Sequence, residues 1–122
     1  MKSYISLYRQ YAQDPVNIGR MNDPTGSAWI KGLCGDMMEM YLIIRNHCIE
    51  DISFYTDGCE ATLACGSFAT AKAKGQNIYD ALGISPAEII NALEELPEEK
   101  HHCAILAAST LYKAIADYLL KK

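Results

Sequence analysis

Residues 37–45, MMEMYLIIR, decide the fold, because they have the two-residue periodicity of a half-buried strand. The face that this periodicity turns inward carries Met38, Met40, Leu42 and Ile44. A short turn at residues 46–48 precedes a second strand-like stretch at residues 49–56. The inward face of that second stretch should carry Ile52, Phe54 and Thr56. Two neighbouring strands joined by a short turn predict an antiparallel β-hairpin.

The chain before the hairpin is expected to hold little regular structure. Residues 3–12 predict a short helix that ends at Asp14-Pro15. One side of this helix carries Ile5, Tyr8 and Tyr11. Residues 14–33 are rich in Gly, Pro, Asn and Asp, which indicates a lead-in with one short strand near residues 27–30. We expect residues 1–33 to be partly mobile.

The chain after the hairpin predicts helices. Residues 61–74 are rich in alanine and end at Gly75, a common residue after a helix. Residues 85–88, SPAE, have a capping-box pattern that should open a helix to about residue 95. Pro97 should open a last helix, whose predicted inward stripe is Ile105, Ala108, Tyr112, Ile115 and Leu119. Strands followed by helices predict an α+β fold: a small antiparallel sheet of about three strands with helices packed on one face.

Length and composition indicate one ordinary globular domain over residues 1–122. The net charge of −4 disfavours nucleic acid and anionic membranes as partners, because both select basic surfaces. No apolar stretch is expected to approach the ~18 residues needed to span a membrane. The first ten residues do not resemble a secretory leader, so the expected location is cytoplasmic. Five cysteines in a reducing compartment favour metal or thiol chemistry over disulfides.

Three of the cysteines have neighbours that suggest a site. Cys34 lies in a glycine loop, Cys59 directly precedes the alanine-rich helix, and Cys103 lies early in the last helix. A helix N-terminus favours a thiolate, so Cys59 is a candidate reactive thiol. Asp36 and His102 adjoin two of these cysteines. Three thiolates, a carboxylate and an imidazole form a ligand set for iron–sulfur or zinc chemistry, provided that the fold brings them together.

The proposed set has one thiolate fewer than a stable four-cysteine cluster site. The fourth place would go to His102 or Asp36, and either one is a more exchangeable ligand than a thiolate. Such a site should hold a metal or cluster loosely. Each cysteine alone could equally be a small buried hydrophobe. We expect that simpler role for Cys65, and surface exposure without function for Cys48.

Two further alternatives are weaker. A cysteine–histidine protease would need His102 and Cys103 to meet, and neighbours on a helix point about 100° apart. Trp29 should be a surface or packing residue in the lead-in.

At these residues the chain resembles the NifU/IscU-type iron–sulfur cluster assembly scaffold family. DPVNIG at residues 14–19 is similar to the family's Asn-Pro-x-Asn-x-Gly segment, and CGDMM at residues 34–38 to its Cys-Gly-Asp-x-Met motif. TDGC at residues 56–59 resembles its second cysteine motif, and Lys-Gly at residues 74–75 the close of the following helix. LPEEKHHCAILA at residues 96–107 resembles the segment that carries its third cysteine.

The resemblance implies a site and a function. The site residues would be Cys34, Asp36, Cys59, His102 and Cys103, with Lys100 nearby. Asp36 would keep the cluster labile. The protein would be a scaffold domain, not an enzyme, that assembles a transient [2Fe–2S] cluster. It would take sulfur from a cysteine desulfurase and iron from solution or a donor, with a reductant where needed, and deliver the cluster to apo-proteins. Zinc commonly binds the empty site in this family.

Several departures keep alternatives open. The family's chaperone-recognition stretch LPPVK is LPEEK here, at residues 96–100, which puts release by an Hsp70-type chaperone in doubt. Glu60 and Cys65 replace small residues, so Cys65 could be a fourth thiol near the site. We expect the longer NifU architecture, with its further cluster domains, to be absent. One rival function is a zinc-dependent sulfur carrier like SufU, although the 43 residues between Cys59 and Cys103 leave no obvious room for that branch's insertion. The other rival is a small structural or regulatory zinc protein.

Overall fold

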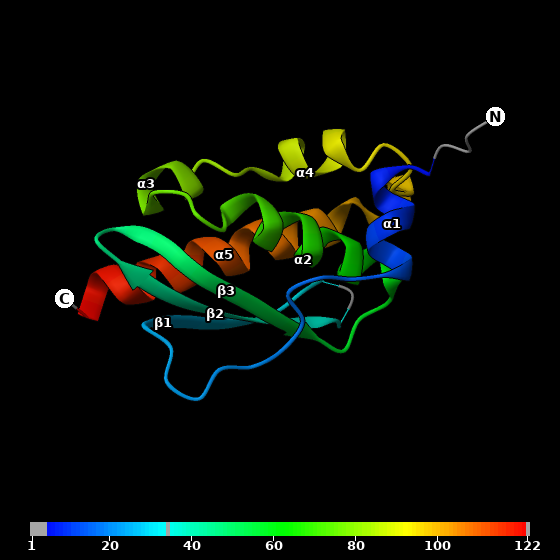
Figure 1. Cartoon of the computed structure of the whole chain (residues 1–122). Coiled ribbons are helices and arrows are strands. Elements are labelled where there is room, and N and C mark those ends of the chain that lie inside the picture. Colours follow the sequence, from blue (N-terminus) through cyan, green and yellow to red (C-terminus); the bar gives the residue numbers. More distant parts are fainter. Residues whose placement is uncertain (1–4, 34, 122) are drawn as a thin grey trace.

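The computed structural model describes residues 5–33 and 35–121. In chain order its elements are α1 (Leu7–Gln13), β1 (Gly26–Lys31), β2 (Met37–Arg45), β3 (Cys48–Thr56), α2 (Glu60–Ala73), α3 (Ile78–Ala81), α4 (Pro86–Ala92), a 3₁₀ turn η1 (Glu98–Lys100) and α5 (His101–Lys121). Helices α2 and α5 lie on one face of the sheet, with α3 and α4 outside them and α1 at one end (Figure 1). The predicted α+β architecture, with helices on one face of a three-stranded antiparallel sheet, is confirmed.

The central strand β2 pairs with β1 on one side and β3 on the other, both antiparallel. Its bounds coincide with the predicted strand, and its buried side chains are those predicted: Met38, Met40, Leu42 and Ile44. The turn to β3 is made by Asn46 and His47, whose φ angles of 52° and 62° suit the tight hairpin turns that match strand twist. Cys48 therefore begins β3 instead of completing the turn, and it is exposed as predicted.

A β-bulge changes which residues of β3 face the core. Consecutive residues of β2 pair with Asp51 and then with Ile49, so Glu50 is the extra residue on β3. Ile49 consequently joins Ile52 and Phe54 on the buried face. Uninterrupted alternation would have placed Glu50 on that face. The bulge thus keeps a charged side chain in solvent and adds an apolar one to the core.

Helix α2 approaches the sheet closely because it is built from small residues. At Gly66 a Cβ atom would lie 2.7 Å or less from three atoms of the Phe54 ring. Cys59 is the N-cap of α2, and Gly75 follows its end with φ of 86°, as the sequence predicts. Close packing fixes the start of α2, and therefore Cys59, relative to the hairpin.

The connection between α2 and α5 differs in detail from the prediction. Ser85 caps α4 as expected, with its Oγ accepting the Glu88 N–H at 3.1 Å, but α4 ends at Ala92, earlier than predicted. The four-residue helix α3 was not predicted, because so short a helix shows no apolar periodicity. Helix α4 covers α5 and α2 from the side away from the sheet, and α3 lies by the hairpin turn, where the Ile78 N–H donates to the His47 carbonyl at 2.8 Å (Figure 1).

The inward stripe predicted for α5 is confirmed in part. Ile105 and Tyr112 are 49% and 60% exposed, whereas Ala108 and Ile115 are buried as expected. The rest of its buried face comprises Cys103, Ala104, Leu106, Ala107, Thr110, Leu111 and Ala114. The sheet, α2 and α4 all contact α5, so its buried arc is wide and includes many alanines that the pattern alone does not mark.

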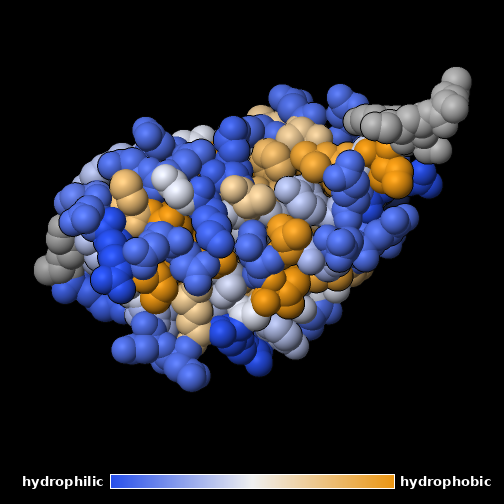
Figure 2. All heavy atoms as spheres, in the orientation of Figure 1, coloured by the Kyte–Doolittle hydropathy of each residue, from blue (hydrophilic) through white to orange (hydrophobic). Residues whose placement is uncertain are grey.

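Among the described residues, one helical segment resembles a membrane span by length and composition alone. The helical segment Glu98–Lys121 is long and apolar enough to cross a membrane by length and composition. Half of its apolar window is buried inside the fold, which accounts for that composition by core packing. The molecular face in Figure 2 shows hydrophilic side chains interspersed with separate small apolar areas.

The N-terminal segment adds helix α1 and an extended stretch, residues 17–20, that lies along the edge of the sheet. Helix α1 begins at Leu7, so Ile5 precedes it and is exposed; residues 3 and 4 of the predicted helix lie outside the described residues. After α1 the backbone of Asn17 and Gly19 bonds to Phe54 at the free edge of β3. Arg20 then pairs with Glu39 of β2 at 2.8 Å. These bonds tie residues 17–20 to the sheet, and the mobility of residues 1–33 stays a prediction.

Candidate functional site

Several of the predicted site residues converge at one end of the molecule. Asp36 directly precedes β2, Cys59 caps α2, and His102 and Cys103 lie in the first turn of α5. Figure 1 shows α2 and α5 beginning at the same end, beside α1. The fold therefore brings together groups that come from three elements far apart in the sequence.

Thr62 connects these groups through its hydroxyl. Its Oγ1 donates to Asp36 Oδ2 at 2.8 Å, and lies 3.4 Å from Cys103 Sγ and 3.9 Å from Cys59 Sγ. Cys103 Sγ is in turn 3.7 Å from His102 Nε2. The expectation that the last two side chains point apart is therefore wrong, because the imidazole reaches back to the neighbouring sulfur.

Cys34 lies outside the described residues, so its role as a ligand stays a prediction. The described residues around it form a tight loop: the Gly32 N–H donates to the Asp36 carbonyl at 2.6 Å, and the Gly35 N–H to the Gly32 carbonyl at 3.2 Å. Gly35 has φ of 90°, a conformation that glycine adopts without strain. This loop places Asp36 beside Thr62.

Cys59 has the features of a reactive thiol. It is exposed, and although partial burial raises its pKa, the backbone N–H groups of Thr62 and Ala61 outweigh that effect. The Lys100 ammonium acts in the same direction as these N–H groups, so the pKa of Cys59 lies below its ordinary value. This agrees with the predicted effect of a helix N-terminus on a thiol.

Cys103 is a different kind of thiol. It is buried, and burial is the main reason that its pKa lies above the ordinary value; the contact with the Thr62 hydroxyl opposes this rise, and negative charge on Cys59 adds to it. Cys65 is buried in the core, and burial raises its pKa strongly. Its burial agrees with the expected packing role, but negative charge on Cys103 and Cys59 adds to the rise, so Cys65 also lies near the site and the possibility of a fourth thiol stays a prediction. Cys48 lies at the other end of β3, away from the site.

The donor chemistry suits a metal or a cluster, but the described donors are not preassembled. Carboxylate, thiolate and imidazole groups are ligands for zinc and iron. Among residues 5–33 and 35–121, no three histidine, cysteine or acidic side chains are arranged to hold an ion. Gly58 leaves space at the site, because a Cβ there would lie 2.6 Å from Thr62 Oγ1 and 2.8 Å from Asp36 Oδ2. Binding would therefore need a small rearrangement of groups that are already close.

Sequence reasoning missed Thr62 and the position of Tyr8. The signal for Thr62 in the sequence was a hydroxyl three positions after Cys59, on the same side of a predicted helix of mostly small residues. The structure adds that this side chain is completely buried. Tyr8 was expected only to share one side of the first helix with Ile5 and Tyr11, and the structure places it near the site. Burial, followed by the charges of Glu60 and Cys59, raises the pKa of its phenol.

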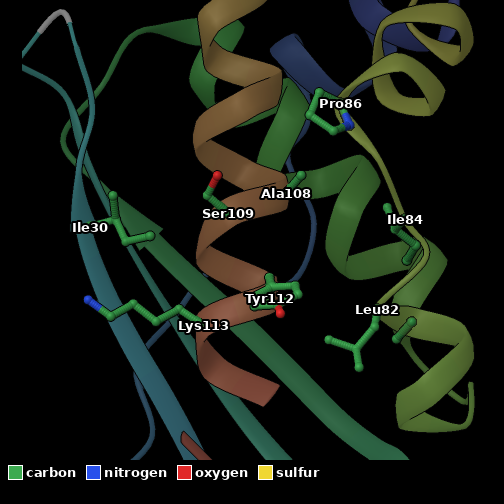
Figure 3. Close-up of a pocket in the computed structure, with 9 residues that line it drawn as sticks. Ile30, Leu82, Ile84, Pro86, Ala108, Ser109, Tyr112 and Lys113 are labelled. Carbon is green, nitrogen blue, oxygen red and sulfur yellow. The ribbon is translucent and has the colours of Figure 1, made fainter. Parts of the chain in front are cut away.

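A separate apolar hollow lies along the exposed side of α5. It has a volume of about 450 Å³ and lies between Ile30 of β1, Leu82 after α3, and Tyr112 of α5 (Figure 3). A smaller hollow of about 160 Å³ shares Ile30 with it and reaches His102. The larger hollow contains none of the predicted site residues, and the smaller one borders the site.

Comparisons with known proteins agree with this architecture. Residues 6–122 match the family described as NifU-like N terminal domain. Over 110 residues the chain is 43% identical to the iron-sulfur cluster assembly scaffold protein IscU 1 of Archaeoglobus fulgidus, covering 89% of this chain and 72% of the relative. Over 125 residues it is 36% identical to IscU of Escherichia coli K12, covering 98% and 97%. The chain belongs to the NifU-like N-terminal domain family, and the resemblance found in the sequence is confirmed.

Solved structures show the same fold. A NifU-like protein (N-terminal) from Brucella abortus superposes with a TM-score of 0.80 at 18% identity, covering 98% of this chain and 96% of that one. FiSufU from Fervidobacterium islandicum AW-1 superposes with a TM-score of 0.77 at 18% identity, covering 92% and 96%. At these identities the likeness establishes the fold alone.

Proposed function

We propose that this protein is a scaffold on which an iron–sulfur cluster is assembled and from which it is delivered to apo-proteins. The observation that carries the proposal is the convergence of Asp36, Cys59 and Cys103 on Thr62, with His102 against Cys103. Relatives that share 36–43% of their residues with this chain are described as iron-sulfur cluster assembly scaffold proteins.

In this proposal the site residues divide the work. Cys59, exposed and with a lowered pKa, supplies a thiolate; Cys34 and Cys103 supply two more. Asp36 and His102 are the exchangeable ligands that leave a [2Fe–2S] cluster labile. The cluster is cargo and the protein performs no turnover of its own.

The partners follow from the chemistry of the cargo. A cysteine desulfurase supplies sulfur as persulfide, and each persulfide sulfur needs two electrons to become sulfide. Iron and a reductant or donor protein complete the set, and apo-proteins receive the product. Three features stay predictions: release without an Hsp70-type chaperone, a cytoplasmic location, and a single domain over residues 1–122.

Spectroscopy of cluster assembly tests the proposal. Metal-free protein is incubated anaerobically with ferrous iron, cysteine and a pyridoxal-phosphate cysteine desulfurase, and the visible spectrum is recorded. Sulfide-to-iron charge-transfer bands should develop, and should be lost in Cys34→Ala, Cys59→Ala and Cys103→Ala. Cys48→Ala is the matched control, because Cys48 is exposed at the far end of β3, and it should retain the bands. Absence of bands in the wild-type protein would refute the scaffold.

The second candidate is a zinc-dependent sulfur carrier, which the exposed and readily ionised Cys59 would also suit. Mass spectrometry after incubation with the desulfurase and cysteine separates the two. A carrier would retain zinc and gain one sulfur atom without charge-transfer bands. A structural or regulatory zinc protein, the third candidate, would retain zinc and gain no sulfur.

A further inference from the structure

The Thr62 hydroxyl occupies the point at which three proposed ligands meet. Its oxygen is 2.8 Å from Asp36 Oδ2, 3.4 Å from Cys103 Sγ and 3.9 Å from Cys59 Sγ. The side chain is completely buried in the third position of α2. These contacts come from the residue before β2, the N-cap of α2 and the first turn of α5, so one oxygen atom links the three segments that form the site.

The hydrogen-bonding capacity of this hydroxyl matches its surroundings. A threonine hydroxyl donates one hydrogen bond and accepts two. Its proton goes to Asp36, and the two thiols lie where each can donate to its oxygen. Gly58 makes room for the bonded pair, because any Cβ there would collide with both Thr62 Oγ1 and Asp36 Oδ2. In the metal-free protein the hydroxyl and its neighbours therefore satisfy one another.

An ion bound jointly by Asp36, Cys59 and Cys103 would be blocked by the hydrogen bond that holds Asp36 Oδ2 on this hydroxyl. No three candidate donors among the described residues already surround a common point, which agrees with such a block. A threonine in a helix has two accessible χ1 rotamers, one of which turns Oγ1 toward a carbonyl of the preceding turn. Thr62 thus has a second position in which its hydroxyl remains bonded.

We propose that Thr62 is a positioning residue that holds the metal-free site closed, and that its hydroxyl must release Asp36 and turn away before Asp36, Cys59 and Cys103 bind a common ion. Thr62 thereby lowers the affinity of the site and favours release. This inference rests on the proposed function, because it concerns how that site takes up and gives up its cargo.

Zinc binding tests the inference independently of cluster assembly. Zn²⁺ is titrated into the metal-free full-length protein in competition with a chromophoric chelator. Thr62→Val keeps the side-chain shape without the hydroxyl and should bind Zn²⁺ about tenfold more tightly, the order of effect of one hydrogen bond to a charged group. Thr62→Ser keeps the hydroxyl and should bind within about twofold of the wild type. Equal or weaker binding by Thr62→Val would overturn the proposal.

A double-mutant cycle shows whether the effect passes through Asp36. In an Asp36→Ala background there is no carboxylate to release, so Thr62→Val should change the Zn²⁺ affinity by less than about threefold. The same tenfold gain in both backgrounds would overturn the proposed route. Circular dichroism checks that each variant is folded. If Thr62→Val is unfolded, Thr62→Ala replaces it and should show the same tenfold gain in Zn²⁺ affinity.

The two proposals fail separately. Charge-transfer bands in the wild-type protein, with no gain of Zn²⁺ affinity in Thr62→Val, would overturn the role of Thr62 and leave the scaffold intact. No bands in the wild type, with the expected order of Zn²⁺ affinities, would refute the scaffold and support Thr62 as the residue that restrains a zinc site.

Discussion

The contact between Gly66 and Phe54 gives a direct test of how α2 is held on the sheet. Gly66→Ala would place a methyl group 2.7 Å or less from three atoms of a completely buried ring. Alanine favours a helix over glycine by about 1 kcal/mol, which acts toward stability. Overpacking of a core typically costs about 1–3 kcal/mol, and a ring overlapped at three atoms lies at the upper end of that range. We therefore expect a net loss of about 2 kcal/mol in the free energy of unfolding.

Urea denaturation followed by circular dichroism measures this loss as a lower midpoint at unchanged slope. Ala71→Gly, at an exposed position of the same helix, is the matched control for the helix-propensity contribution alone. Phe54→Leu should reduce the cost of Gly66→Ala, because the overlapping ring is gone. A Gly66→Ala protein more stable than the wild type would refute the reasoning that the ring lies against the helix backbone.

Three further predictions concern the thiols and two carboxylates. In metal-free protein iodoacetamide should modify Cys59 faster than the buried Cys103, and the pH at which the Cys59 rate is half-maximal should lie below that of a free thiol. Peptide mass spectrometry measures the rate at each cysteine, and equal rates would contradict the assigned exposures. Asp36→Ala should lengthen the lifetime of an assembled cluster in the presence of a chelator, and a shorter lifetime would count against its role in lability. The Ser27 N–H bonds Asp117 Oδ2 at 3.0 Å and lowers the pKa of that carboxyl, so its contribution to stability should be present at neutral pH and decline as the pH falls through about 4. Asp117→Asn should show a shallower loss of stability between pH 6 and 3 in urea melts; an unchanged pH dependence would argue against this bond.

The hairpin and the start of α2 could be predicted because local sequence determines them. Alternation fixes the inward face of β2, and a cysteine between a glycine and an alanine-rich helix is placed at an N-cap by the helix itself. Only adjacent residues are needed for either conclusion. The same reasoning succeeded for Ser85, whose capping bond closes within four residues.

Features that depend on distant contacts could not be predicted in this way. The bulge at Glu50 depends on the register against β2, and the inward stripe of α5 depends on three neighbours that only the fold provides. Thr62 is the clearest case, because its importance comes from a carboxylate before β2 and a thiol in α5. A hydroxyl in a helix has no distinctive pattern until its partners are placed.

The site draws its groups from the start of β2, the N-cap of α2 and the first turn of α5, which are far apart along the chain. A bound cargo would therefore act as a cross-link between the hairpin and the two central helices, and would restrict the unfolded chain much as disulfides do. The loaded protein would resist proteolysis and heat better than the empty protein, and each delivery of the cargo would return the protein to the less stable, empty state. The stability of the whole fold would thus depend on whether the site at one end of the molecule is loaded.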